Sequence, residues 1–506
     1  MVYQHMTWFR LICCSRFSLA FLQMTSDVPD EFYQGPEVAY SLVFGENYFT
    51  WEWDHQLRSF MHPLFYALGF KLLQNYSIDF SILLVLLPRL QHALLSVIAE
   101  TMFCLTVNQM YGMPVASWTA FCLSTCIFAN HCFTRTLSNS LETSLMMIAF
   151  SYYPAWNESF FKAHNRKLNF LKYLIFSALA CYARPTSAIL SVPMSLYCLW
   201  NLDFKATMVF QMGVVGINAL ICQVAIDSAL YGGGTTVFPL WNFVKFNFLS
   251  DSNKIFGVNS VFWYIYAGVP GVLGTFLPFF LLGVYKSWRD KRMSRLMLYL
   301  IVLSVVFYSI PPHKEMRFIL PVLPLMLVYA AYYFANCASY RVQNLCRWSL
   351  ASVNAIVTLY LSIYHQSGSI FAAHYLNIRL KNTIAPSAAI LTPCYTLPGR
   401  THMHIHNLTI RSLDCRPNLD QKPDYLTETQ QFIKDPREWT VENFGSENTF
   451  ANFSYLVMFD YVYPLIEDLL NRDGFFIDKY FHYSHFADEN DGQSKILLVL
   501  ASTNNL

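Results

Sequence analysis

Long apolar segments recur along most of this chain and are separated by short polar connections. A helix needs about 20 apolar residues to cross the hydrocarbon core of a bilayer. By that criterion we predict about eleven spans, at residues 7–23, 82–107, 114–130, 138–154, 168–183, 186–201, 207–228, 261–284, 296–311, 318–337 and 348–366. The pattern therefore indicates a mostly α-helical polytopic membrane protein, with two of its spans broken or tilted.

Three polar regions interrupt or follow these spans. The loop at 24–81 is rich in aromatic and acidic residues, which favours amphipathic helices lying at the membrane surface. A second long loop covers 229–260. The tail at 367–506 contains two strand-like segments, Phe481–Ala487 and Lys495–Ala501, around an Asp-Gly turn. We expect a transmembrane domain at 1–366 and a small α/β domain at 367–506.

The composition supports a membrane protein and argues against other classes. The chain has 506 residues, of which 55% are hydrophobic and 13% charged, with a net charge of +2. Soluble domains carry about a quarter charged residues, and near-neutral charge gives no reason to expect nucleic-acid binding. Most cysteines lie in apolar segments. Cys394 and Cys415 lie in the polar tail and could form a disulfide if that tail faces an oxidising compartment.

Basic residues concentrate in three short loops and indicate the orientation of the chain. These loops lie near residues 162–172, 286–295 and 341–347. Lysine and arginine favour the cytoplasmic side of membrane proteins. With a cytoplasmic N-terminus, the predicted spans put all three loops on that side. The acidic loop and the C-terminal tail then lie on the opposite side.

Asp30 and Glu31 form the first candidate site, within Pro29-Asp30-Glu31-Phe32-Tyr33-Gln34. A carboxylate at this place could accept the proton of an attacking sugar hydroxyl. A polyprenyl phosphate leaving group carries negative charge well, so it would need no general acid, unlike the leaving group of an ordinary glycoside. The alternative is structural, because Pro29-Asp30-Glu31 could simply begin a helix with an acidic N-cap.

The second candidate site is His313-Lys314-Glu315-Met316-Arg317-Phe318, between two apolar segments. Four ionisable side chains are costly near a bilayer, which favours a role in binding an anionic lipid headgroup. If the segment is helical, His313 and Arg317 share a face and could bind one phosphate, while Lys314 points elsewhere. Glu315 could orient a base or pair with Arg317. The alternative is ordinary anchoring of basic side chains at the membrane interface.

Further polar residues lie at the ends of other spans. Arg135 precedes the segment Ser138-Asn139-Ser140-Leu141-Glu142-Thr143, and Arg184 precedes Pro185-Thr186. Each cation alone fits a helix-end anchor, whereas several converging cations would suit a lipid phosphate. Glu142 is either a buried structural group or part of an acceptor site. Glu37 adds another carboxylate to the first loop.

Three histidines alternate at 402, 404 and 406. A strand would place His402, His404 and His406 on one face, as a metal site requires. No carboxylate or cysteine completes such a site nearby. We therefore expect no bound metal.

Together these motifs resemble glycosyltransferase family 22, the dolichyl-phosphomannose-dependent mannosyltransferases with the GT-C architecture. The resemblance covers about residues 25–340. Within the family, the chain is most similar to the enzymes that add the third mannose of glycosylphosphatidylinositol (GPI) anchors. That similarity rests on Tyr231–Phe248, Phe262-Trp263-Tyr264 and Thr392–Thr396. The chain departs from the family pattern at Gly35-Pro36 and at Met316, where an acidic residue is common.

The resemblance implies an inverting transfer of mannose from dolichyl-phosphomannose, in the lumen of the endoplasmic reticulum, to a GPI-precursor glycolipid. It implies Asp30 as the base for the acceptor hydroxyl, with Glu31 supporting or replacing it. Residues that would hold the donor phosphate are His313, Lys314, Arg317 and Arg184. Residues that would support the site or bind the acceptor are Glu37, Arg135, Glu142 and Glu315. No cofactor or nucleotide sugar is implied.

Two alternatives follow from the same features. A relative that mannosylates the dolichol-linked oligosaccharide of N-glycosylation would share the donor and the motifs and differ in acceptor. A lipid or sugar transporter would also keep charges in its membrane region, although transporters usually show paired internal repeats, which we do not find in this sequence.

Overall fold

The computed structural model describes residues 2–45, 49–156, 163–249, 255, 257–291, 293–336, 339–419, 422–445 and 450–503. Contacts within the chain divide it into two compact units. The first unit comprises Met1–Phe21, His55–Tyr66 and Pro88–Leu359, and the second comprises Leu22–Asp54, Ala67–Leu87 and Tyr360–Leu506. Most of the first polar loop therefore folds with the C-terminal part of the chain.

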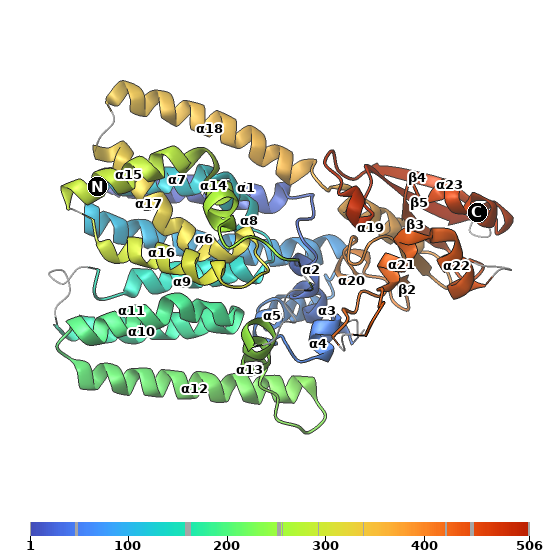
Figure 1. Cartoon of the computed structure of the whole chain (residues 1–506), viewed down its shortest axis with the longest axis horizontal. Coiled ribbons are helices and arrows are strands. Elements are labelled where there is room, and N and C mark those ends of the chain that lie inside the picture. Colours follow the sequence, from blue (N-terminus) through green and yellow to red (C-terminus); the bar gives the residue numbers. More distant parts are fainter. Residues whose placement is uncertain are drawn as a thin grey trace. The chain divides into compact units, whose positions relative to one another are not determined.

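The first unit is helical, and helices occur at each of the predicted spans (Figure 1). Their bounds are α1 Val2–Leu22, α6 Ser81–Tyr111, α7 Met113–Thr125, α8 Ile127–Cys132, α9 Ser138–Tyr152, α10 Ala163–Ala183, α11 Ala188–Asn201, α12 Lys205–Tyr231, α13 Pro239–Val244, α14 Val269–Leu273, α15 Leu277–Asp290, α16 Arg295–Ser309, α17 Leu323–Asn336 and α18 Tyr340–Ile363. Short helical turns, η1 Pro185–Ser187, η2 Lys245–Leu249, η4 Tyr264–Gly268, η5 Gly274–Phe276 and η6 Met316–Val322, connect some of them. Helix α5, Met61–Asn75, contributes residues to both units, as do α6 and α18, and α1 ends one residue into the second unit.

Extended residues lie within one predicted span, 114–130, and between two others, 168–183 and 186–201. Cys126 has φ −63° and ψ 123° and separates α7 from α8. Arg184 has φ −150° and ψ 125° and separates α10 from η1 and α11. The residue before a proline is disfavoured in the α region, so Pro185 explains the second break. The backbone at Arg184 is extended, so this residue belongs to neither α10 nor η1.

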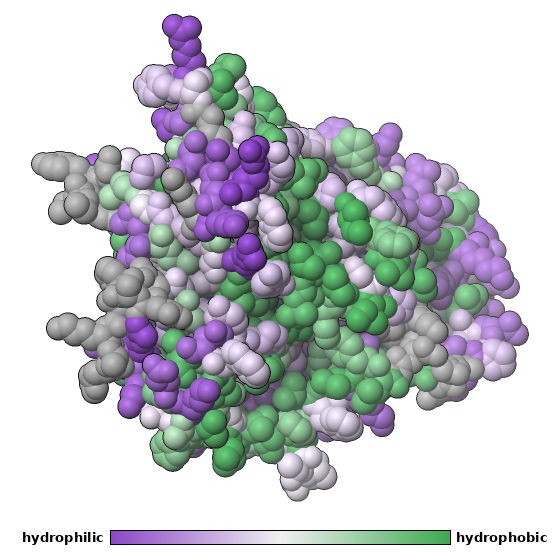
Figure 2. Space-filling model, turned by 60° about the vertical axis from the view of Figure 1, so that its left-hand side comes forward, coloured by the Kyte–Doolittle hydropathy of each residue, from purple (hydrophilic) through white to green (hydrophobic). Residues whose placement is uncertain are grey.

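Five described segments are long and apolar enough to cross a membrane on their own: Ser81–Tyr111, Lys205–Tyr231, Tyr264–Asp290, Met316–Asn336 and Tyr340–Leu380. Many large apolar side chains are exposed, among them Trp200, Phe210 and Ile310. Figure 2 shows apolar residues gathered over a broad area of one face. Exposed apolar surface of this extent is typical of contact with lipid. The protein is thus a multi-pass membrane protein, and the number of eleven spans stays a prediction.

A buried ion pair and its hydrogen bonds join four helices of the first unit, α1, α6, α7 and α8. Arg16 of α1 donates to both carboxylate oxygens of Glu100 of α6, at 2.5 and 3.0 Å. Arg16 also donates to Asn130 Oδ1 of α8 at 2.6 Å and to the Leu123 carbonyl at 2.8 Å. Both charged side chains are fully buried. The positive charge of Arg16, which interrupts the first apolar segment, is thereby paired with Glu100 inside the helix bundle.

The second unit contains a five-stranded sheet in the order β2-β1-β3-β5-β4. Strands β2, β1 and β3 are parallel, and β5 and β4 are antiparallel additions. The strands are β1 Ser387–Leu391, β2 Thr409–Ser412, β3 Tyr455–Phe459, β4 Phe475–His482 and β5 Ile496–Ser502. The other elements are α2 Asp30–Tyr33, α3 Pro36–Phe44, α4 Trp51–Asp54, α19 Gly368–Leu380, α20 Arg400–Met403, α21 Glu428–Lys434, α22 Pro436–Phe444, α23 Tyr463–Arg472 and η7 Glu489–Asp491.

Helices cover both faces of this sheet. Alternate residues of β3 enter two separate hydrophobic clusters, Val457 with α19 and Leu456 with α21, α22 and α23. Strands β1 and β3 are buried along their whole length, as expected for central strands covered on both sides. The predicted α/β character of the C-terminal region is confirmed. The predicted hairpin is β4–β5, but its first strand ends at His482 rather than at Ala487.

The structure also settles two expectations about the segment that follows β1. Cys394 and Cys415 form a disulfide with a Cα–Cα distance of 6.0 Å. Residues 402–406 do not form the strand that would place the three histidines on one face, because α20 ends at Met403 and β2 begins only at Thr409. The three histidines consequently do not share a strand face. Among the described residues, no group of three or more His, Cys, Asp or Glu side chains is arranged to hold a metal ion.

Candidate functional site

Arg184 brings together the three polar motifs of the membrane region, which are residues 138–143, 184–186 and 313–318. Its Nη1 atom donates to Ser138 Oγ at 3.1 Å and to Asn139 Oδ1 at 3.2 Å, at the start of α9. Its guanidinium carbon lies 5.5 Å from the centre of the Phe318 ring. Asn139 in turn donates to the Arg317 carbonyl at 3.1 Å. Segments about 45 and 130 residues apart in sequence thus meet around one buried arginine.

Glu142 provides the negative charge opposite Arg184. Its Oε2 lies 3.6 Å from Arg184 Nε, and its Oε1 accepts hydrogen bonds from Ser187 at 2.8 Å and Thr186 at 3.3 Å. Both charged side chains are buried. A charge removed from water needs a partner and further hydrogen bonds, and this arrangement supplies both. Glu142 is therefore the ion-pair partner of Arg184, and the two roles expected for it, structural or in the acceptor site, stay predictions.

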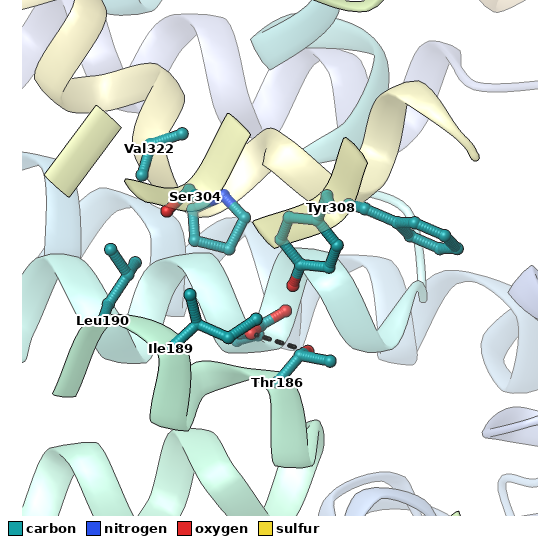
Figure 3. Close-up of a pocket in the computed structure, with 9 residues that line it drawn as sticks. Thr186, Ile189, Leu190, Ser304, Tyr308 and Val322 are labelled. Atoms are coloured by element: carbon teal, nitrogen blue, oxygen red, sulfur yellow. Dashed lines mark hydrogen bonds between the residues drawn. The ribbon is translucent and has the colours of Figure 1, made fainter. Parts of the chain in front are cut away.

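A small cavity of about 10 Å³ lies beside this pair. It is lined by polar groups from Glu142, Thr186, Ser304 and Tyr308 together with apolar side chains of α11 and η6. Figure 3 shows the Tyr308 hydroxyl directed toward Thr186 and the carboxylate with which Thr186 is hydrogen-bonded. This volume suits the centre of one water molecule rather than a sugar.

Residues 313–317 bring His313 and Arg317 to one carboxylate. Glu315 Oε1 lies 3.0 Å from His313 Nε2, and Arg317 reaches both carboxylate oxygens, at 2.6 and 2.8 Å. The segment is not a continuous helix, because Glu315 has φ −135° and ψ 151° and η6 begins at Met316. Burial opposes ionisation of Glu315, but Arg317 and His313 outweigh it and hold its pKa below the ordinary value of 4.5.

Lys314 points away from this group, toward two backbone carbonyls. Its Nζ donates to the Pro311 carbonyl at 2.6 Å and to the Asn259 carbonyl at 3.3 Å. Arg135 is also buried, and its Nε donates to the His131 carbonyl at 3.0 Å in its own segment. The described contacts therefore bring Arg184, Arg317 and His313 into one region, with Lys314 and Arg135 bound to backbone carbonyls.

Asp30 and Glu31 occupy the first turn of α2 in the second unit. Pro29 is the N-cap residue, with no side-chain cap, so the acidic N-cap that the sequence left open is not formed. Asp30 is half-buried, whereas Glu31 is buried and its Oε2 accepts a hydrogen bond from the Asp27 amide at 3.2 Å. The two neighbouring carboxyl groups thus differ in their access to solvent.

Glu37 of α3 is buried and bound to the start of α20. Its carboxylate accepts hydrogen bonds from the Arg400 amide at 2.8 Å, the Thr401 amide at 3.2 Å and the Thr401 hydroxyl. Burial raises the pKa of Glu37, although the hydrogen bonds from Thr401 and Arg400 act in the opposite direction. These contacts connect α3 to the start of α20 within the second unit.

The sequence did not single out Arg58, the only arginine between residues 24 and 81. Arg58 and Arg184 line one cavity of about 30 Å³, together with Ser59, Gln223 and apolar residues of α13. The Arg58 carbonyl accepts a hydrogen bond from the Tyr231 hydroxyl at 2.7 Å. The signal that could have identified Arg58 is its position as a single arginine in a loop rich in acidic and aromatic residues.

A larger groove of about 320 Å³ adjoins this cavity. It is lined mainly by apolar side chains of α10, α11 and α12, which lie side by side (Figure 1). Tyr182, Pro185, Gln223 and Leu240 line both spaces. An apolar groove of the first unit therefore ends at residues that neighbour Arg184.

Comparison with known proteins identifies the family. A model of the Alg9-like mannosyltransferase family matches residues 7–404. The chain belongs to the Alg9-like mannosyltransferase family. A relative from Bos taurus, GPI alpha-1,2-mannosyltransferase 3, is 34% identical over 485 residues, which is 95% of this chain and 86% of the relative. The relative of the same name from Danio rerio is 33% identical over 94% of this chain and 86% of its own length.

The fold is that of a solved GT-C protein. ArnT from Cupriavidus metallidurans, solved bound to undecaprenyl phosphate, matches with a TM-score of 0.63 over 99% of this chain and 98% of that protein, at 12% identity. The predicted family and fold are confirmed. As a member of the Alg9-like mannosyltransferase family, the chain is a glycosyltransferase, and this excludes the transporter alternative.

Proposed function

We propose that this chain transfers the third mannose, in α-1,2 linkage, from dolichyl-phosphomannose to the dimannosyl GPI precursor in the lumen of the endoplasmic reticulum. The acceptor and linkage rest on the relatives named GPI alpha-1,2-mannosyltransferase 3. The chemistry rests on one observation above others: Arg184 joins the starts of α9, η1 and η6, beside the Glu315–Arg317 pair.

In the proposed reaction, the 2-hydroxyl of the acceptor mannose attacks the anomeric carbon of the donor. The bond between that carbon and the phosphate oxygen breaks, and its electron pair leaves with dolichyl phosphate. A β-linked donor then gives an α-linked product. Asp30 accepts the hydroxyl proton, because it is the member of the carboxyl pair that is accessible. Buried Glu31 supports the loop through Asp27.

The leaving phosphate needs positive charge that is already in place. Arg184, Arg317 and His313 supply it, and Glu142 and Glu315 hold the two arginines in position. Lys314 adds positive charge from the adjacent turn. The groove along α10, α11 and α12 suits an isoprenoid chain, because it is apolar and ends beside Arg184.

A microsomal transfer assay with dolichyl-phosphomannose and a dimannosyl GPI lipid tests this proposal. We expect a trimannosyl product from the wild type and its loss in Asp30→Asn at equal protein amounts. Transfer to a dolichol-linked oligosaccharide instead would move the chain to the N-glycosylation branch. Full activity of Asp30→Asn would remove Asp30 as the base and leave the acceptor assignment standing.

A further inference from the structure

The loop that carries Asp30 is bound by a second loop from the C-terminal part of the chain. The Glu37 carboxylate, seven residues after Asp30, accepts three hydrogen bonds from Arg400 and Thr401. All of these residues belong to the second unit. The Thr401 hydroxyl also lies 3.1 Å from His402 Nδ1. One buried side chain thereby connects α3 to residues more than 360 positions later in the sequence.

Gly399 has no side chain where Glu37 approaches. A Cβ atom added to Gly399 would lie 2.6 Å from Glu37 Oε2 and 2.9 Å from its carboxyl carbon. Both distances are shorter than a carbon atom tolerates without displacement. Any larger residue at 399 would therefore push the Glu37 carboxylate away from the Arg400 and Thr401 amides.

Contacts of α2 reinforce the same connection. The Tyr33 hydroxyl donates to the Leu397 carbonyl at 2.8 Å, and the Tyr33 ring lies 4.7 Å from the Tyr395 ring. Phe32 contacts the His402 ring edge-on at 5.3 Å. The residues that follow Asp30 and Glu31 along α2 are thus held by the 395–402 segment.

A disulfide closes the loop that makes these contacts. Cys394 and Cys415 lie on either side of residues 395–402 and are bonded to each other. A cross-link at the base of a loop reduces the number of conformations that the loop can adopt. The residues that bind Glu37 and Tyr33 are therefore held at both ends of a closed loop.

We propose that the disulfide-closed loop 394–415 is a positioning element for the catalytic carboxylate, acting through Glu37–Thr401 and Tyr33–Leu397. Helix α2 has four residues, so few hydrogen bonds of its own fix its orientation. The contacts from loop 394–415 supply the missing constraint. A displacement of about 1 Å in a reacting group can cost 100-fold in rate. This inference rests on the proposed role of Asp30 as the base.

Thr401→Val and Thr401→Ser form the matched test. Valine keeps the shape of threonine without the hydroxyl that binds Glu37, while serine keeps the hydroxyl. With the transfer assay on the full-length protein in microsomes, we expect kcat to fall about 10- to 100-fold in Thr401→Val. We expect the KM for dolichyl-phosphomannose to stay within about twofold, and Thr401→Ser to remain close to wild type.

Two further variants keep the test decisive. Gly399→Ala should reproduce the loss of kcat by displacing Glu37, and it serves if Thr401→Val does not accumulate. Asp468→Asn changes an exposed ion pair elsewhere in the same unit and should leave kcat unchanged. Hydrogen exchange of the amides of residues 31–40 should accelerate in Thr401→Val and not in Asp468→Asn.

The outcomes separate this inference from the proposed function. A wild-type protein that makes no trimannosyl product refutes the proposed function itself. An active wild type with kcat unchanged in both Thr401→Val and Gly399→Ala overturns the positioning role and leaves the function intact. Equal losses in Thr401→Val and Thr401→Ser would also overturn it, because the hydroxyl would then not be the group that matters.

Discussion

Arg184, in the break between α10 and η1, faces Glu142 of the neighbouring helix α9, with Arg184 Nε 3.6 Å from Glu142 Oε2. Neither charged side chain would be tolerated alone in lipid, because an unpaired charge at membrane depth is costly. Each side chain has additional partners: Ser138 and Asn139 for the arginine, Thr186 and Ser187 for the glutamate. The pair therefore both stabilises the bundle and fixes a cation in place.

The geometry of Arg184 predicts that lysine cannot replace it. Arg184→Lys keeps the positive charge but loses the fork that reaches Ser138 and Asn139 together. We expect catalytic efficiency to fall by about 10-fold or more, mainly through a higher KM for dolichyl-phosphomannose. Steady-state transfer kinetics at matched protein amounts measure this. A lower kcat with unchanged KM would place the role of Arg184 at the leaving phosphate alone, and unchanged kcat and KM would argue against any role at the donor phosphate.

The different environments of Asp30 and Glu31 predict unequal effects of neutralising them. Asp30→Asn should lower kcat by about 100- to 10,000-fold, because the accessible carboxylate would be the base. Glu31→Gln should have a smaller effect, since an amide oxygen can still accept the hydrogen bond from Asp27. Transfer assays on both variants make the comparison. A greater loss in Glu31→Gln would exchange the two roles.

Because the pKa of Glu315 is lowered, we predict that its carboxylate stays ionised and bound to Arg317 and His313 in mild acid. For a carboxyl group whose pKa is lower in the folded protein, its contribution to stability is present above the unfolded pKa. It is lost only as the pH falls through the lower folded value. Since Arg317 and His313 lower the pKa of Glu315 from 4.5, Glu315→Gln should reduce activity to a similar fraction at pH 5.5, 6.5 and 7.5. A deficit that disappears toward pH 5.5 would contradict the shift.

The buried Arg16–Glu100 pair predicts opposite outcomes for single and double substitutions. Arg16→Leu or Glu100→Leu alone leaves one buried charge without its partner and should cost about 3–5 kcal/mol. The double variant removes both charges and should recover much of the folded protein. Size-exclusion profiles of detergent-extracted protein give the folded fraction. Equal losses in the double and single variants would show that the pair is not the source of the effect.

The apolar pattern was sufficient to predict the positions of the helices, because lipid-facing and buried helices both need runs of hydrophobic residues. It did not predict that α7 and α8 separate at Cys126, since nothing in that apolar segment punctuates the helix. The strand predicted at 481–487 was misplaced because the strand that forms, β4 at Phe475–His482, has only a weak pattern in the sequence. Residues 475–482 are mostly half-buried or exposed along an edge strand, which gives a weaker sequence signal than a fully buried run.

The sequence by itself determined a polytopic helical protein, its candidate carboxylates and cations, and its resemblance to a mannosyltransferase family. Composition, apolar run length and local motifs are all properties of neighbouring residues. Tertiary structure alone decided that Arg184 meets Glu142 and Asn139, and that Glu37 binds Thr401. These partners lie between 42 and 364 residues apart, and no local pattern reports which distant groups satisfy a buried charge.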